Sequence, residues 1–277
     1  MTRIGWLIDT TAPRLGEAAD GRASLAEAAR AAGHAVIEGP LAEIADRPQA
    51  ILAGLPVVVR APVQTLRRLR FSAIADSPGG LVLMTYGSSP NFSYPGTAAH
   101  YGRHMLNDDF VVLPFGEIER RGLEGGPGFF LRPNTDAKAF SGLPIPAVDW
   151  DHELSSLRQL HNPDPADLIV RASLKGLPAE YRFVIADGVV VTGSCYMVDG
   201  VAAPSRGVDG DCLKLARTIA QEPWQPCTIY ICDIALTRQG PRLLELNAFS
   251  CSGLYACDTE AIIQAVAQAV WKELTGE

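Results

Sequence analysis

Short apolar runs alternate with stretches of helical periodicity over the first third of the chain. The runs that predict buried strands lie at residues 3–8, 36–37, 57–59 and 81–84. The alanine-rich stretch 23–32, followed by Gly33, predicts a helix with a glycine stop. Residues 87–96 are rich in Ser, Pro, Gly and Asn, which indicates a loop. Strands separated by helices are typical of a parallel α/β sheet, which we expect in this part of the chain.

From about residue 106 the pattern changes to compact apolar segments joined by turns. Strand candidates lie at residues 110–115, 129–132 and 167–171. Two β-rich runs on either side of Asp187-Gly188 predict a hairpin, because Asp-Gly is a favoured hairpin turn. A second hairpin is predicted where residues 228–236 and 242–246 flank a polar turn. Apolar periodicity predicts helices at residues 211–221 and 258–274.

These patterns predict an N-terminal α/β domain with a parallel sheet at residues 1–105 and an α+β domain at residues 106–277. The formal net charge of −7 argues against a nucleic-acid surface, which needs a basic face. No apolar run approaches the roughly 20 residues of a membrane span, and the start of the chain does not resemble a signal peptide. We therefore expect a cytoplasmic protein that binds neither nucleic acid nor membrane. The expected partner is a small-molecule or peptide substrate, and a homodimer is left open.

The cysteines and histidines indicate neither a zinc site nor a catalytic triad. None of the six cysteines forms a Cys-x-x-Cys pair, and the five histidines are scattered along the chain. Reduced and mostly buried thiols are therefore expected.

Two acids and an amide near the C-terminus form the best-defined candidate site. Glu245 and Asn247 are two residues apart in a predicted strand, so their side chains point to the same face. Pairing through the turn of the second hairpin brings Asp233 beside them. Carboxylate and amide oxygens are the ligands that Mg²⁺ prefers, so we interpret these residues as a candidate magnesium site. The alternative is an exposed hairpin face on which the acids only contact water.

Two cations near the middle of the chain are candidates for phosphate binding. Arg132 ends a predicted strand, and Lys138 follows in a polar loop. A guanidinium fork and a mobile ammonium suit a phosphate clamp, although surface cations beside turns are common. The glycine-rich turn at residues 124–128 is not a Walker loop, because Gly-Lys-Ser/Thr is missing.

Glu180 and Arg182 begin the first predicted hairpin and allow two interpretations. They form a cross-strand ion pair on a solvated edge, or Arg182 points inward to phosphate with Glu180 near a ribose hydroxyl or the metal. Their spacing does not choose between these.

In this order, the motifs resemble an ATP-grasp ligase of the clade that has arginine in place of the first ATP-binding lysine. The wording that carries the resemblance is Arg-Pro-Asn-Thr-Asp-x-Lys-x-Phe-Ser-Gly at residues 132–142 and Glu-Leu-Asn-Ala-Phe-Ser-Cys-Ser-Gly-Leu-Tyr at residues 245–255. The resemblance covers roughly residues 106 to 275. It implies an ATP-grasp fold, in which two α/β subdomains clasp ATP, preceded by the N-terminal α/β domain.

The resemblance also implies roles for individual residues. The nucleotide-binding set would have Arg132 and Lys138 on the phosphates, Glu180 nearby, and the backbone near Ile169, Val170 and Arg171 on the adenine. The metal set would be Asp233, Glu245 and Asn247, holding one or two Mg²⁺ ions. The implied activity is an ATP- and Mg²⁺-dependent carboxylate–amine ligase that forms ADP through an acyl-phosphate and acts on an amino acid, peptide or similar small molecule. The alternatives are a non-catalytic nucleotide-binding module and a small-molecule kinase of the same fold.

Two departures from the family pattern affect the substrate end. Many relatives follow the asparagine with Pro-Gly, whereas this chain has a Ser-rich loop in which Ser250, Ser252 and the amide of Gly253 are expected to cradle a carboxylate. Many relatives have an arginine two residues before the first acid, where this chain has an isoleucine. Arg182 or Arg206 is expected to supply that catalytic charge instead.

Overall fold

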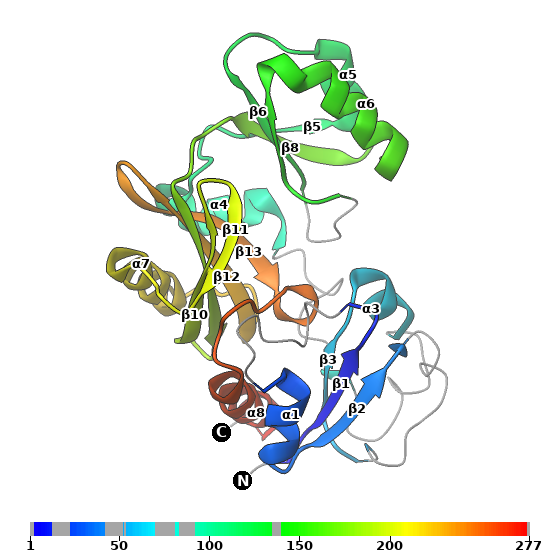
Figure 1. Cartoon of the computed structure of the whole chain (residues 1–277), viewed down its shortest axis with the longest axis vertical. Helices are drawn as coiled ribbons and strands as arrows, with labels where there is room; N and C mark the ends of the chain where they lie inside the picture. Colours follow the sequence, from blue (N-terminus) through cyan, green and yellow to red (C-terminus); the bar gives the residue numbers. More distant parts are fainter. Residues whose placement is uncertain are drawn as a thin grey trace. The chain divides into compact units, whose positions relative to one another are not determined.

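The computed structural model describes residues 3–12, 23–41, 52, 54–69, 81–82, 92–134 and 140–275. The chain divides into two compact units (Figure 1), which are described separately below. The first unit combines Met1–Ser89 with Leu177–Glu277, and the second is Pro90–Gly176.

The N-terminal part of the first unit is the parallel sheet that the alternating pattern predicts. Its strand order is β2-β1-β3-β4 and every printed pairing is parallel. The strands are β1 (Gly5–Asp9), β2 (Ala35–Gly39), β3 (Val57–Arg60) and β4 (Leu81–Val82). Two helices accompany them, α1 (Leu25–Ala31) and α3 (Val63–Leu69). Helix α1 begins with a capping box, in which Ser24 and Glu27 satisfy each other's backbone N–H groups.

The C-terminal part of this unit is an antiparallel sheet with strand order β11-β10-β9-β12-β13. Its strands are β9 (Ala179–Ala186), β10 (Val189–Val198), β11 (Val201–Ser205), β12 (Ile229–Thr237) and β13 (Gly240–Ala248). Helix α7 (Gly210–Gln221), the short helix η6 (Phe249–Cys251) and helix α8 (Thr259–Thr275) complete it. Both predicted hairpins are confirmed. At the turn of the first, Asp187 (φ 49°) and Gly188 (φ 73°) have the left-handed backbone that an Asp-Gly turn requires.

One face of the antiparallel sheet changes from apolar to polar along its strands. At one end, Val184 of β9 and Ile231 of β12 are paired in register and belong to the same buried core cluster as residues of β1, α1 and α8. Two residues further along the same face, Arg182 and Asp233 are paired instead. The apolar half anchors the sheet to the rest of the unit, and the polar half is available for chemistry.

The second unit contains a four-stranded antiparallel sheet with strand order β5-β8-β6-β7. Its strands are β5 (Val111–Pro114), β6 (Gly128–Pro133), β7 (Leu143–Pro146) and β8 (Leu168–Ser173). Its helices are α4 (Tyr94–Tyr101), η4 (Gly102–His104), α5 (Phe115–Arg121), η5 (Ala147–Asp149) and α6 (Trp150–His161). A buried cluster centred on Phe115, Leu131 and Trp150 packs α5 and α6 against the sheet. Gly128 has φ 125°, and a Cβ there would lie 2.1 Å from the carbonyl oxygen of Ile145, so only glycine fits.

The loop prediction for residues 87–96 was wrong at its C-terminal end, because α4 begins within it at Tyr94. The hydroxyl of Ser93 accepts a hydrogen bond from the N–H of Gly96 at 3.1 Å, and a proline occupies the first turn. Serine before proline is a helix start as well as a loop signal, which explains the error. Helices α5 and α6 and strands β7 and β11 had no counterpart among the predicted elements.

The predicted domain boundary near residue 105 stays a prediction. Among the described residues, no helix combines the length and apolarity needed to cross a membrane.

Candidate functional site

A chain of polar contacts links three neighbouring strands on the polar half of the sheet face. Arg182 of β9 donates two hydrogen bonds to Asp233 of β12, from Nε to Oδ1 at 2.8 Å and from Nη2 to Oδ2 at 2.6 Å. Asn247 of β13 donates from Nδ2 to Asp233 Oδ2 at 3.1 Å and to Glu245 Oε1 at 2.7 Å. The strand register places Asp233 directly opposite both Arg182 and Glu245, as the hairpin pattern predicted for the two acids.

This cluster is buried, which excludes the alternative of a solvated hairpin face. Asp233 and Asn247 are both 0% exposed, and Arg182 is 7% exposed. Burial acts to lower the pKa of the Arg182 guanidinium, but the charge and hydrogen bonds of Asp233 outweigh it and raise that pKa. Both groups are therefore charged at neutral pH, and Arg182 points inward rather than along a solvated edge.

The residues present fit a hard divalent cation. The Oδ1 atom of Asn247 is buried and has no hydrogen-bond partner among the described residues, so it is an oxygen ligand without another function. Two carboxylates adjoin it, and Mg²⁺ is commonly bound through one or two carboxylates while its other ligands come from water and phosphate. In the part of the chain that the structure describes, no group of three or more His, Cys, Asp or Glu residues is arranged to hold a metal ion.

An aromatic pair lies against the charged cluster, and no sequence pattern indicated it. The rings of Tyr196 and Tyr255 are stacked with centroids 4.9 Å apart and an interplanar angle of 11°. The Arg182 guanidinium carbon lies 5.4 Å and 5.0 Å from their respective centroids. Tyr196 donates its hydroxyl hydrogen bond to Glu180. Burial raises the pKa of the Glu180 carboxyl, and the nearby charges of Asp233 and Glu245 raise it further.

The Ser-rich loop after β13 is held by two arginines. Arg182 Nη1 donates to the carbonyl oxygen of Gly253 at 2.8 Å, and Nη2 of Arg60 donates to that of Ser252. Ser252 donates its own hydroxyl to the carbonyl of Ala248 at 2.7 Å. The Ser250 hydroxyl oxygen is buried, with no hydrogen-bond partner among the described residues. The loop therefore lies directly beside the acidic cluster, where a substrate loop is expected.

Arg60 is a site residue that the sequence analysis missed. It ends β3 at the carboxyl edge of the parallel sheet, where ligands bind in open α/β sheets. Its signal was a single charged residue closing an apolar strand of three valines. Arg206, predicted to be catalytic, is exposed just after β11, and its role stays a prediction.

The predicted nucleotide-binding residues of the second unit lie on two adjacent strands. Arg132 of β6 is opposite Val170 of β8, and Pro133 is opposite Ile169. The Arg132 side chain is buried, with its guanidinium carbon 5.3 Å from the ring centroid of Tyr94.

Arg171 pairs with Glu124 at 2.9 Å and lies over the ring of Phe129, with the guanidinium carbon 3.7 Å from the centroid. Strand β8 is paired with both β5 and β6, so the adenine contact assigned to the backbone near Ile169 stays a prediction. Lys138 lies outside the described residues.

The cysteines add no further chemistry. All six are free thiols. Cys251 is partly buried in the Ser-rich loop, where its Sγ lies 3.9 Å from the carbonyl oxygen of Ala248.

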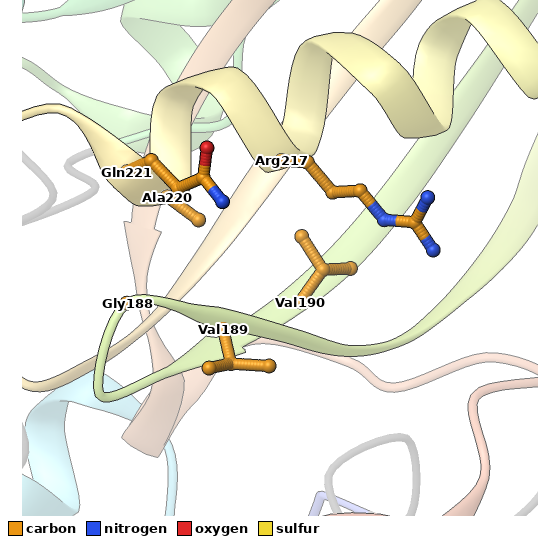
Figure 2. Close-up of a pocket in the computed structure, with 6 residues that line it drawn as sticks. All are labelled: Gly188, Val189, Val190, Arg217, Ala220 and Gln221. Carbon is orange, nitrogen blue, oxygen red and sulfur yellow. The ribbon is translucent and has the colours of Figure 1, made fainter.

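A separate pocket of about 220 Å³ lies between the turn of the first hairpin and α7 (Figure 2). Its lining is formed by Gly188, Val189, Val190, Arg217, Ala220 and Gln221. The pocket has no carboxylate or imidazole, so it offers no metal ligands of the kind found in the acidic cluster.

Residues 120–266 match a family model that is described as an ATP-grasp domain, family 3 of its clade. The chain belongs to this ATP-grasp family. No curated protein matches the chain.

Several solved structures share the ATP-grasp fold over almost the whole chain. D-cycloserine synthetase DcsG is 14% identical with a TM-score of 0.58, and the match covers 97% of this chain and 99% of that one. A RimK domain ATP-grasp protein from Sphaerobacter thermophilus is 14% identical with a TM-score of 0.57, over 97% and 99% of the two chains. D-alanine–D-alanine ligase from Bacillus anthracis is 12% identical with a TM-score of 0.54, over 100% and 99%. The predicted fold is therefore confirmed.

Proposed function

We propose that this ATP-grasp protein is an ATP- and Mg²⁺-dependent ligase that activates a carboxylate as an acyl-phosphate, releases ADP and joins the acyl group to an amine. The observation that carries the proposal is the buried cluster of Asp233, Glu245 and Asn247, with the unpartnered Asn247 Oδ1 beside two carboxylates. Solved relatives support the proposal. They include an ATP-grasp ligase, PsnB, in complex with a precursor, Mg and ADP, and a D-alanine–D-alanine ligase complexed with ATP.

In the proposed reaction, Asp233, Glu245 and Asn247 would hold Mg²⁺, which neutralises phosphate charge when bound. Asn247 currently donates its amide N–H groups to both acids. A half-turn of that amide would direct Oδ1 toward the acids, where it completes a ligand set of oxygens only. Arg182 keeps Asp233 ionised and oriented through its two hydrogen bonds, and its positive charge offsets the crowding of acids.

Arg132 would bind phosphate in place of the lysine found in most ATP-grasp proteins, with Lys138 as a second cation. Arg132 is buried against Tyr94, which limits its freedom and orients its planar fork for an oxyanion. The substrate loop would bind the other reactant through the hydroxyls of Ser250 and Ser252 and the amide of Gly253. The substrate class we propose is an amino acid, peptide or similar small molecule bearing a carboxylate or an amine.

The test is to incubate the full chain with ATP, Mg²⁺ and a mixture of the twenty amino acids and short peptides, and to follow ADP and new masses. ADP with a condensed product supports the ligase. ADP with a stable phosphorylated product contradicts it in favour of a small-molecule kinase, and tight ATP binding without turnover indicates a non-catalytic nucleotide-binding module.

The metal assignment is tested separately with Glu245→Ala. Glu245 is partly exposed and its side chain adds little packing, so the variant should keep its fold and lose Mg²⁺-dependent ADP formation. The matched control is Glu260→Ala, an exposed glutamate on α8. Wild-type ADP formation in Glu245→Ala removes Glu245 from the metal site.

A further inference from the structure

Two arginines from two different sheets hold neighbouring carbonyl groups of the substrate loop, residues 249–253. Arg182, on β9 of the antiparallel sheet, donates to the Gly253 carbonyl at 2.8 Å. Arg60, on β3 of the parallel sheet, donates to the Ser252 carbonyl. The next residue of the parallel sheet adds a third contact, because the N–H of Ala61 donates to the Ser250 carbonyl at 2.9 Å. The end of β3 therefore fixes this loop at two carbonyl groups.

With its carbonyl groups engaged, the loop keeps its hydrogen-bond donors available. The Ser250 hydroxyl is buried and finds no hydrogen-bond partner in the part of the chain that the structure describes. The N–H groups of Gly253 and Leu254 likewise donate to no other described residue. A peptide carbonyl and the N–H that follows it point in opposite directions, so holding the carbonyls of Ser252 and Gly253 also directs these two N–H groups. Converging donors of this kind suit an anion such as a carboxylate.

Arg60 is held in place closely enough to act as such an anchor. Its side chain is 0% exposed, and the guanidinium carbon lies 4.5 Å from the ring centroid of Phe249, within the loop itself. Burial lowers the pKa of Arg60 to about 9, so the guanidinium is still protonated at neutral pH and donates. A planar guanidinium can stack on Phe249 and bond to a carbonyl at once, which a lysine ammonium does less well.

We propose that Arg60 is a positioning residue of the substrate site: it holds the loop at residues 249–253 so that the Ser250 hydroxyl and the Gly253 and Leu254 N–H groups face the carboxylate of the second substrate. This deepens the proposed function and rests on it for the assignment of the loop to the substrate. The residue acts through the loop and touches no reacting atom.

The decisive measurement is hydrogen exchange of the full-length chain, followed by mass spectrometry, in Arg60→Met and Arg60→Lys. Arg60→Met should speed exchange in peptides covering residues 249–258 by about tenfold or more, and leave peptides of β12 and β13 unchanged. Arg60→Lys, which keeps a donor, should recover part of the protection. The matched control is Arg30→Met, which removes a surface arginine paired with Glu38 on the same sheet and should leave the loop unchanged.

Two exchange results overturn the proposal. One is unchanged exchange of residues 249–258 in Arg60→Met. The other is an equal rise in β12, β13 and α8, which makes Arg60 a general core residue instead.

A second measurement follows ADP formation with the twenty amino acids as the probe. Arg60→Met should raise the KM for the amino acid about tenfold while the KM for ATP stays within twofold, and a change confined to the KM for ATP contradicts the proposal. Absence of ADP formation by the wild-type chain contradicts the proposed function with this substrate class. The exchange result then decides the role of Arg60 alone.

Discussion

Arg182 and Asp233 form a buried ion pair joined by two hydrogen bonds, at the centre of the polar half of the sheet. Asp233 is 0% exposed, so its carboxylate depends on Arg182 and Asn247 rather than on water. The same carboxylate is the proposed Mg²⁺ ligand, which means that one side chain serves both stability and function.

The first prediction follows from that pairing. Asp233→Ala leaves the Arg182 guanidinium buried without its carboxylate, and should lower the free energy of unfolding by about 3–5 kcal/mol. The control is Asp187→Ala, which removes an exposed pair with Lys272 and should cost at most about 1 kcal/mol. Urea unfolding of both variants measures the difference. Equal stability losses would mean that the buried pair contributes no more than a surface one.

The sequence predicted the elements whose signals are local. Asp187-Gly188 indicated a hairpin turn, and the two-residue spacing of Glu245 and Asn247 placed both side chains on one face. The register that brings Asp233 opposite Glu245 followed from the turn between their strands.

The contacts that the sequence did not predict are those made by tertiary packing. Arg60 meets Ser252 across 192 residues of chain, and no local pattern marks such a pair. Tyr196 and Tyr255 come from a strand and a loop that meet only in the folded unit. The start of α4 was missed for a different reason, because the same residue types that begin a helix also occur in loops.

The second prediction concerns the cysteines. Cys212 is fully buried, and burial raises the pKa of its thiol to about 12, so roughly one thiol in ten thousand is ionised at pH 8. Burial also raises the pKa of Cys232 well above its usual value. Cys227 and Cys251 are only partly buried. Iodoacetamide at pH 8 should therefore label Cys227 and Cys251 in the native chain and reach Cys212 and Cys232 only after unfolding, as measured on tryptic peptides. Rapid native labelling of Cys212 would contradict its burial.

The third prediction is a pH dependence of stability caused by Glu180. Burial and neighbouring acids raise the pKa of this carboxyl above its unfolded value of 4.5, so the folded chain holds a proton that the unfolded chain releases. Its contribution to stability is fully present below pH 4.5 and is lost as the pH rises through the raised pKa.

Glu180→Gln should remove this fall, so the free energy of unfolding of the wild-type chain relative to the variant should decrease from about pH 4.5 upward. Urea unfolding from about pH 4.5 to about pH 8 measures it, with Glu260→Gln as the exposed control. Parallel pH profiles for the wild-type chain and Glu180→Gln would show that Glu180 carries no such linkage.

The fourth prediction tests the phosphate role of Arg132. Its guanidinium lies over Tyr94, and Nε donates to the carbonyl of Pro133 at 3.2 Å, so the side chain is oriented without a ligand. Losing a charge-assisted contact to phosphate costs about 1.5–3 kcal/mol, so Arg132→Ala should weaken ATP binding by a factor of about ten to a hundred in calorimetric titration. Arg132→Lys should restore part of the affinity because it keeps the charge but loses the fork. Arg158→Ala, which removes an exposed pair with Glu119 in the same unit, should leave the affinity unchanged. Wild-type affinity in Arg132→Ala, with an intact fold by circular dichroism, would exclude Arg132 from the nucleotide site and leave phosphate binding to other cations.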